Sequence, residues 1–394
     1  MINYKGAARK ASCDGQRSLH LRLIASDVNA VKPIWQAIEE RAGAGGLANS
    51  WAWTETWLRH YGDLVPHHVV IGERHGIPCA ITLLTEGVGQ RIGPIPVRTL
   101  HIGTAGEPDD ETIRVQYNRV LADPVDRVEF TRLLPEFAAR SELRWDEFHL
   151  NGFAPEDAAP ILDHDRTFIA DRVVNYVTEL AVIRARGGTV LSALHGDSGK
   201  KIRRSSRRFE ETFGPVKIEW AETLEQARSM FDEMCVLHQA RWQAAGDPGV
   251  FASPRFTGFH TDIVERLFHS GGIALARVSA GDVTIGCDYS FIERNRLLGY
   301  QWGLGSFEDK RLSPGLVTAV TVMQSAMERG LHEYDHLAGD ILYKHQLSTT
   351  ARSLIWARAP RGARIQVIYK LAEAKRLARR LPARQKKAAG RISS

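Results

Sequence analysis

The segment Tyr300–Lys344, YQWGLGSFEDKRLSPGLVTAVTVMQSAMERGLHEYDHLAGDILYK, decides the fold of this 394-residue chain. It joins a predicted strand at 297–302 to a helix and a second strand. Ser313 is a suitable N-cap, Pro314 suits the first helical turn, and apolar residues recur at helical spacing up to Gly330. Such a helix start offers unpaired N–H groups and the positive end of the dipole, which suit a pyrophosphate. An ordinary capped helix fits the same pattern.

Composition indicates a globular protein with room for two domains, since 43% of the residues are hydrophobic and 25% are charged. Residues 1–16 are polar and basic, which is unlike a secretory signal or a membrane anchor, and no apolar run is long enough to span a membrane. We therefore expect a cytoplasmic protein. The cysteines Cys13, Cys79, Cys235 and Cys287 stand far apart without a CxxC pair, so neither a metal site nor a disulfide framework is expected.

Positive charge is concentrated at the C-terminal end. From Arg358 onward the charge is +11, so with a total of +6 the rest of the chain carries −5. Apolar residues in this tail step by three and four, which predicts a basic amphipathic helix. It could dock on the body with a solvated basic face, or contact a membrane surface or an acidic polymer. Nucleic acid is an unlikely partner because no recognised binding motif accompanies the charge.

The order of predicted elements repeats along the chain. Each half ends with a helix followed by a strand, and the sequences EFHLNG at 147–152 and EYDHLAG at 333–339 share His-Leu-x-Gly. Two copies of one αβ domain explain this repeat most simply. The second half then runs from a strand at 173–180 through two helices, three antiparallel strands, a helix and a strand.

A long predicted helix near the start of the second half, between about Leu191 and Phe209, is strongly basic. Such a run is usually a solvated helix face, and a groove for an anionic substrate is the alternative. The basic residues are Lys200, Lys201, Arg203, Arg204, Arg207 and Arg208.

A set of short motifs in the second half resembles a known family. The motifs are His238-x-x-Arg241-Trp242, Gly249-Val250-Phe251, Ile285-Gly286, Ser313-Pro314-Gly315, and Gly339-Asp340 followed by Tyr343-Lys344. Together they resemble the BioF-like/CelD-like acyltransferases of the GNAT superfamily, relatives of the double-GNAT FemAB proteins. The resemblance covers residues 175–358, while the first half matches only in pattern. Two positions depart from the family, where Ile341 replaces an acid and Leu312 replaces an aromatic residue.

The resemblance implies an α/β (α+β) fold of two tandem GNAT-like domains, each with a mixed, mostly antiparallel sheet flanked by helices. We expect a flexible segment at 1–17, a degenerate domain at 18–172, an acyltransferase domain at 173–358, and the basic helix and tail at 359–394. The implied enzyme is an acyl-CoA-dependent N-acyltransferase that uses acetyl-CoA, without a metal, and transfers acyl groups other than aminoacyl groups. Its acceptor would be an amine or hydroxyl of a cell-envelope sugar, polysaccharide precursor or small metabolite. The alternatives are a FemAB-like aminoacyl-tRNA-dependent transferase and a non-catalytic accessory protein of exopolysaccharide (cellulose) biosynthesis.

The resemblance also suggests site residues. Tyr343 lies where GNAT enzymes often keep a general acid, and a packed aromatic is the alternative. Asp335 and Asp340 are candidates for the base, although Asp340 could instead cap the following helix. The predicted cofactor-binding residues are Gln301, Gly303, Ser313, Pro314, Gly315, Leu316 and Lys344. His238 and Arg241 share one helix face, and the predicted substrate-binding residues are His238, Arg241, Trp242 and Tyr300.

Overall fold

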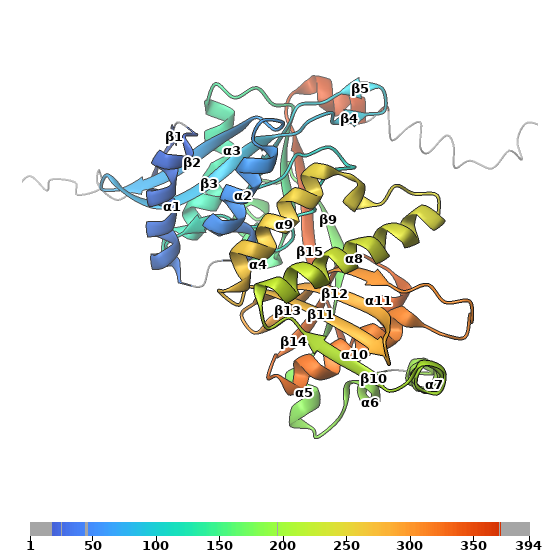
Figure 1. Ribbon diagram of the computed structural model, residues 1–394. Coiled ribbons are helices and arrows are strands. Elements are labelled where there is room, and N and C mark those ends of the chain that lie inside the picture. The colour runs from blue at the N-terminus through green and yellow to red at the C-terminus, as the bar shows by residue number, and fades with distance from the viewer. Residues whose placement is uncertain (1–17, 25, 44–45, 195, 370, 372–394) are drawn as a thin grey trace, which may run out of the picture.

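The computed structural model describes residues 18–369 and 371, apart from 25, 44, 45 and 195. The described chain forms one 13-stranded mixed sheet in the order β1-β2-β3-β6-β8-β15-β9-β14-β13-β12-β11-β10, with β7 paired to β3. Helices flank this sheet, as Figure 1 shows. The predicted fold class, a mixed sheet flanked by helices, is therefore confirmed.

The first half begins with a strand and two helices, which are followed by antiparallel strands. Helix α1 is capped by Asp27, and α2 by Ser50, whose side chain accepts from the Trp53 N–H. The elements are β1 (His20–Ile24), α1 (Val28–Ala42), α2 (Trp51–Tyr61), β2 (His67–Arg74), β3 (Ile77–Glu86), β4 (Arg91–Ile92), β5 (Ile95–Pro96), β6 (Thr99–Ile102), β7 (Leu121–Ala122), α3 (Arg127–Arg140), β8 (Glu147–Phe153) and α4 (Pro155–Leu162).

The second half repeats the order of a strand, two helices, antiparallel strands, a helix and a strand, with additional helices before it. Its long helix α8 starts at a capping box formed by Thr223 and Gln226. The elements are β9 (Ile169–Thr178), α5 (Leu180–Ala185), α6 (Val190–Ala193), α7 (Ser198–Phe213), β10 (Val216–Trp220), α8 (Leu224–Ala244), α9 (Pro254–Phe268), β11 (Ile273–Ala280), β12 (Val283–Glu293), β13 (Arg296–Leu304), α10 (Pro314–Glu328), β14 (Glu333–Ala338), α11 (Leu342–Leu347) and β15 (Thr350–Pro360).

The predicted long helix between Leu191 and Phe209 is wrong, because the chain forms two helices there. Gly196 adopts a φ of +64° between α6 and α7, a backbone conformation that a helix cannot continue through. Of the predicted C-terminal helix, residues 363–369 are helical, and residues 372–394 lie outside the described part of the chain, as does the predicted flexible segment 1–17.

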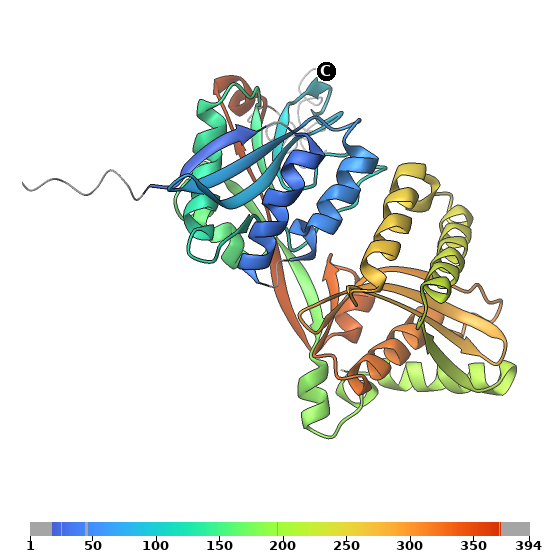
Figure 2. The same cartoon turned by 60° about the vertical axis from the view of Figure 1, so that its left-hand side comes forward.

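Strands β9 and β15 cross between the two halves. Strand β9 follows α4 of the first half but pairs with β14, through Tyr334 opposite Thr178. Strand β15 follows α11 of the second half but pairs with β8, through Ala357 opposite Leu150. The two strands also pair with each other, and Figure 2 shows them running between the two lobes. The boundary predicted between residues 172 and 173 falls inside β9.

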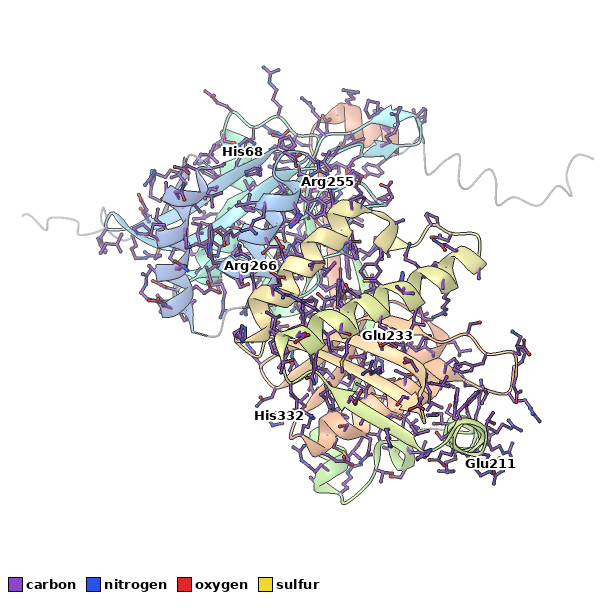
Figure 3. All side chains as sticks on the ribbon, viewed as in Figure 1. His68, Glu211, Glu233, Arg255, Arg266 and His332 are labelled. Carbon is purple, nitrogen blue, oxygen red and sulfur yellow. The ribbon has the colours of Figure 1, made fainter. Side chains whose placement is uncertain are left out.

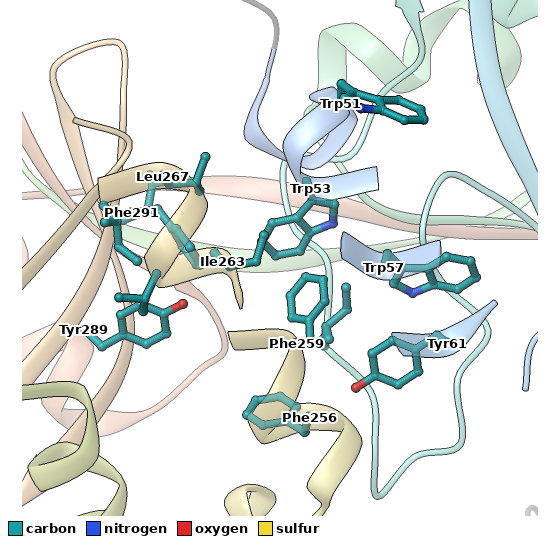
Figure 4. Close-up of a cluster of buried hydrophobic side chains, with 14 of the residues drawn as sticks. Trp51, Trp53, Trp57, Tyr61, Phe256, Phe259, Ile263, Leu267, Tyr289 and Phe291 are labelled. Atoms are coloured by element: carbon teal, nitrogen blue, oxygen red, sulfur yellow. The ribbon is translucent and has the colours of Figure 1, made fainter. Parts of the chain in front are cut away.

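An aromatic core joins the two halves. The Trp53 ring on α2 lies edge-on to Phe259 of α9 and Phe291 of β12, at centroid distances of 4.9 and 5.7 Å. Figure 4 shows this cluster, with tryptophans of α2 facing phenylalanines of α9. Around it, Arg255 binds Asp63 at 2.6 Å and Arg266 binds Glu55, both from α9 to the first half (Figure 3). The aromatic burial and these ion pairs hold α2 against α9.

Candidate functional site

Strands β13 and β14 are parallel neighbours over a short distance only. They pair at Arg296 with Glu333, Leu297 with Tyr334, and Leu298 with Asp335. Beyond Leu298, β13 continues along β12 and β14 continues along β9, but these two strands no longer pair with each other in the described structure. On the β14 edge, the Leu337 and Ala338 N–H groups donate to Asp335 and Gln116, and their carbonyl oxygens accept from Lys344. The main-chain groups that lose their strand partner therefore lie on β13. We refer to this opening as the β13–β14 gap.

A β-bulge at Tyr300 shapes one edge of the gap. Gly299 pairs with Ser290 and Gln301 pairs with Tyr289, so Tyr300 has no residue opposite it. After the bulge, Trp302 faces α10, while Gly303 faces α8. A Cβ on Gly303 would lie 2.3 Å from the Met234 carbonyl oxygen of α8. The close approach of α8 therefore explains Gly303, whose predicted cofactor contact stays a prediction.

A buried carboxylate lies on the α10 side of the gap. Asp288, with 1% exposure, accepts hydrogen bonds from Trp302 Nε1 at 2.6 Å, the Tyr334 hydroxyl at 3.0 Å and the Ser290 hydroxyl at 2.6 Å. Burial outweighs these donors and raises the pKa of Asp288 to about 6. This network fixes Trp302 and Tyr334 against one another at the edge of the gap.

Tyr343 of α11 lies on the same side as Trp302. The two rings are 5.5 Å apart, so a residue following β14 contacts a residue of β13 across the gap. Burial raises the pKa of Tyr343, while nearby Arg241 opposes the shift. The phenol is therefore protonated at neutral pH, as a general acid must be.

The N-terminus of α10 lies beside the end of β13. The Ser313 side chain does not cap the helix, contrary to the prediction, and the Ser313 N–H instead donates to Ser205 Oγ of α7 at 2.8 Å. The next amides, of Gly315 and Leu316, have no acceptor within the described ranges. The structure thus brings the predicted group Ser313, Pro314, Gly315 and Leu316 together at an open helix start, whereas Gln301 lies on the side of β13 that Gly303 turns toward α8.

Helix α7 packs its buried side against this helix start, through Ser205. Ile202, Ser205 and Phe209 are buried on the side toward α10. The opposite side exposes Lys201, Arg203, Arg204 and Arg207 to solvent. This exposed basic face agrees with both interpretations of the sequence, a solvated helix face and a surface that binds an anionic group.

Asp335 lies on the other side of the gap, toward the first half. It is fully buried and accepts from the Tyr117 hydroxyl, from Asn175 Nδ2 at 3.2 Å and from the Leu337 N–H at 2.8 Å. Burial raises its pKa. Because successive strand residues face opposite sides, Asp335 points away from the side on which Tyr343 lies.

A segment of the first half, residues 113–117, covers the gap on the Asp335 side. The Tyr300 hydroxyl donates to the Ile113 carbonyl oxygen at 2.7 Å, and the Ala338 N–H donates to Gln116 Oε1 at 2.7 Å. Tyr117 adds the bond to Asp335. The predicted substrate residue Tyr300 is therefore held between the two halves.

Lys344 and Asp340 lie at the end of β14. Lys344 is buried, with 7% exposure. Its ammonium donates to the carbonyl oxygens of Leu337 and Ala338, both at 3.0 Å. Burial lowers its pKa to about 8. Asp340 is exposed and accepts from the Tyr176 hydroxyl at 3.1 Å. Lys344 of α11 thus binds the end of β14. Of the two predicted bases, Asp335 and Asp340, Asp340 is the more accessible.

The predicted substrate-binding residues His238, Arg241 and Trp242 lie near the C-terminal end of α8. His238 is buried between Trp242 and Phe251, with ring centroids 5.9 and 5.0 Å away. Burial lowers the pKa of His238. Arg241 is exposed and Trp242 is 42% exposed. His238 therefore packs Trp242 in place, and Arg241 is the member of the set that lies near Tyr343.

Several residues of the site were missed by the sequence analysis. Asp288 is the acid within the buried run of β12, and an acid among strand residues of this kind is a signal that could have marked it. Trp302 and Tyr334 flank residues that were singled out. Gln116 and Tyr117 come from a loop of the other half, and nothing in their local sequence indicates a contact with β14.

Removing the buried His260 should change the pH dependence of stability. Its ring nitrogens contact the Tyr289 and Tyr300 hydroxyls at 3.0 and 3.1 Å, and burial lowers its pKa to about 3. Because the folded pKa lies below the unfolded value, stability is full above pH ~6.5 and is lost as the pH falls. Between pH 7.5 and 5 the native chain should lose about 2 kcal/mol more than His260→Gln, as measured by urea unfolding. Equal losses would contradict the assignment.

A family comparison matches residues 196–345 to an acetyltransferase (GNAT) domain. This segment includes α7, α10, β13, β14 and nearly all of α11, and therefore contains the whole gap. The GNAT assignment of the second half is thus confirmed at the level of the domain. No curated protein sequence matches the chain closely enough to count as a relative.

Solved structures share the fold over almost the full length. FemX superposes with a TM-score of 0.53 at 10% identity, covering 89% of this chain and 99% of that one. The C-terminal domain of a putative lysylphosphatidylglycerol synthetase from Agrobacterium fabrum gives 0.51 at 12% identity, with 89% and 96% covered. L-PGS from Bacillus licheniformis gives 0.51 at 10% identity, with 88% and 97% covered. At these identities the likeness shows the fold alone, and the closer affinity to CelD-like proteins stays a prediction.

Proposed function

We propose that the chain is an acyl-CoA-dependent acyltransferase and that transfer takes place at the β13–β14 gap. The observation that carries this proposal is the pairing of an unfilled gap between two parallel strands with an open helix N-terminus beside it. Both features lie within the matched domain, residues 196–345. Such a helix start binds a pyrophosphate through its amides and its dipole.

The residues present fit a CoA ester. The free amides of Gly315 and Leu316 would hold the pyrophosphate, and the exposed face of α7 offers Arg203 and Arg204 to a further phosphate. Main-chain groups at the gap edges could bind the amide-rich arm of the cofactor. Lys344 contributes less than predicted, because its ammonium already bonds to two carbonyl oxygens.

Three tasks remain for the protein during transfer. A main-chain N–H of β13 at the gap edge would polarise the thioester carbonyl. Tyr343, protonated at neutral pH, would donate a proton to the departing thiolate. Asp340 is the exposed carboxylate that would accept the proton of the attacking amine, whereas Asp335 positions Tyr117 and the end of β14.

The acceptor is proposed to be an amine or hydroxyl of a cell-envelope or polysaccharide-related sugar or of a small metabolite. An aminoacyl-tRNA donor is the second candidate, because α7 packs on α10 and carries an exposed basic face on its other side, which suits a polyanion as well as a CoA phosphate. The fold offers no ground for excluding aminoacyl transfer. The third candidate, an accessory protein without activity, and a membrane or acidic-polymer contact of the tail stay predictions.

No helix within the described ranges is long and apolar enough to cross a membrane. A cytoplasmic location remains the proposal.

Calorimetric titration of the full chain tests the proposal. Acetyl-CoA and desulfo-CoA should both bind with micromolar affinity, because the pyrophosphate and the pantetheine arm carry the contacts. Absence of binding by both compounds would overturn the proposal, and retention on aminoacyl-tRNA that falls steeply with salt would then support the second candidate.

Changing Tyr343 to phenylalanine should slow transfer without weakening binding. Loss of the hydroxyl removes the proton donor, so turnover should fall about 100-fold, within the range of general acid catalysis. Thiol release in an acceptor screen measures turnover, and calorimetry measures binding of acetyl-CoA. Tyr176→Phe, which removes an exposed hydroxyl from Asp340, is the comparison variant. Unchanged turnover in Tyr343→Phe would remove the residue from the mechanism.

A further inference from the structure

A small cavity lies where β13 and β14 part. It is lined by Leu298, the last residue of β13 that pairs with β14, and by Leu337, which lies just beyond the pairing on β14. Both side chains are buried, with 4% and 7% exposure. The cavity therefore adjoins the end of the gap at which the β13–β14 pairing stops, on the side of the sheet that faces α8 and α9.

The opposite wall of this cavity belongs to the first half. Ile113, Val115 and Tyr117 line it, together with Trp53 of α2. Ile113 is fully buried and Val115 is 5% exposed. The second half alone would leave this cavity open.

The wall is held in place from both of its ends. The Ile113 carbonyl oxygen accepts from Tyr300, and the Tyr117 hydroxyl binds Asp335. Between them, Gln116 accepts from the Ala338 N–H at 2.7 Å. Tyr117 has a φ of +55°, a conformation that costs a residue with a side chain free energy and persists only where contacts impose it. A longer ligand could therefore enter only by breaking these contacts.

The cavity is small. Its volume is about 30 Å³, whereas a single water molecule needs roughly 10–15 Å³. Two or three heavy atoms fit. Beyond the carbonyl carbon, an acetyl group has two such atoms, the methyl carbon and the oxygen, and a propionyl group has three.

We propose that Ile113, Val115 and Tyr117 of the first half close the acyl pocket of the second half and limit the donor to acetyl or propionyl groups. The inference rests on the proposed function, because it places the thioester in the gap with its acyl group toward Leu298 and Leu337. The first half then determines the acyl specificity of the site. Its own parallel strands, β6 and β8, leave no comparable gap, because Asn118 of the same half pairs with Phe153 of β8.

Titration of the full chain with acetyl-, propionyl-, butyryl- and octanoyl-CoA tests the proposal. Acetyl- and propionyl-CoA should bind within threefold of each other, and octanoyl-CoA at least tenfold more weakly. Val115→Ala, which removes two methyl groups from the wall, should improve butyryl-CoA binding about tenfold with acetyl-CoA within threefold, since one methylene in an apolar pocket changes affinity by 10-fold or more. Val190→Ala in α6, a buried valine that does not line the cavity, is the matched control and should leave the ratios unchanged.

Filling the cavity gives an independent test. Ala48 also lines it, so Ala48→Val should weaken acetyl-CoA at least tenfold and leave desulfo-CoA within threefold, because the latter carries no acyl group. Desulfo-CoA binding together with equal affinity for octanoyl- and acetyl-CoA would overturn the inference and leave the proposed function standing. So would unchanged acyl preference in a folded Val115→Ala chain. Failure of every CoA compound to bind would instead overturn the proposed function.

Discussion

Replacing Gly315 by glutamate is expected to abolish acetyl-CoA binding while the chain stays folded. The new carboxylate would lie in the first turn of α10, beside the free amides of Gly315 and Leu316. A negative charge there stabilises the helix by about 0.3–1 kcal/mol, so folding should not suffer. The same charge, about 4–5 Å from a phosphate, opposes binding by roughly 3–4 kcal/mol at an effective dielectric of about 20. Calorimetry should show a loss of at least about 100-fold.

A glutamine at position 315 separates charge from size. A Cβ at this position would meet only Leu304 Cδ1, at 3.1 Å, the end of a flexible side chain that can move. Gly315→Gln should therefore keep binding within about tenfold, since it adds the same bulk without the charge. Thermal unfolding of both variants checks that they fold. Wild-type affinity in Gly315→Glu would show that the pyrophosphate does not bind at α10.

Replacing Asp288 by alanine is expected to destabilise the second half strongly. The change leaves the buried Tyr334 and Ser290 hydroxyls without their acceptor, and the Trp302 N–H keeps only its longer bond to the Tyr334 oxygen, at 3.2 Å. An unsatisfied buried donor costs about 1–3 kcal/mol, so the unfolding free energy should fall by at least about 2 kcal/mol. Urea unfolding followed by tryptophan fluorescence measures the loss.

Asparagine at position 288 tests the charge of this carboxyl. Burial raises the pKa of Asp288 to about 6, above its unfolded value, so the group favours folding below pH ~3.8 and loses that contribution as the pH rises to about 6. Asp288→Asn should remove this decline and lose less stability than Asp288→Ala at pH 7, because its oxygen still accepts hydrogen bonds. A decline of equal size in Asp288→Asn would contradict the raised pKa.

Elements with strong local patterns could be predicted from the sequence. The strand predicted at 297–302 corresponds to β13, and the helix expected between Pro314 and Gly330 is α10. Both predictions rest on local sequence: on the spacing of apolar residues and, for the helix, on the residues that start and stop it. The Ser313 side chain does not cap α10, and the bond of its N–H to Ser205, more than a hundred residues away, is a contact that local sequence does not indicate.

Features that depend on contacts between distant segments could not be predicted. The pairing of Tyr117 with Asp335 joins residues from the two halves, and no periodicity encodes it. The cofactor contact of Gly303 stays a prediction, and its close approach to Met234 of α8 is a second contact that local sequence does not indicate. Among the predicted site residues, the group at the start of α10 came together, while Tyr343 and Asp335 lie on opposite sides of the gap.

The exchange of β9 and β15 has a consequence for synthesis on the ribosome. Strand β8 is complete at Phe153, but its partner β15 ends at Pro360, about 200 residues later. At about 5–20 residues per second, the nascent first half waits on the order of 10–40 s with an unpaired strand edge. Such an edge readily pairs with other chains. Slow translation or premature termination between these positions should therefore produce aggregates in place of a soluble first half.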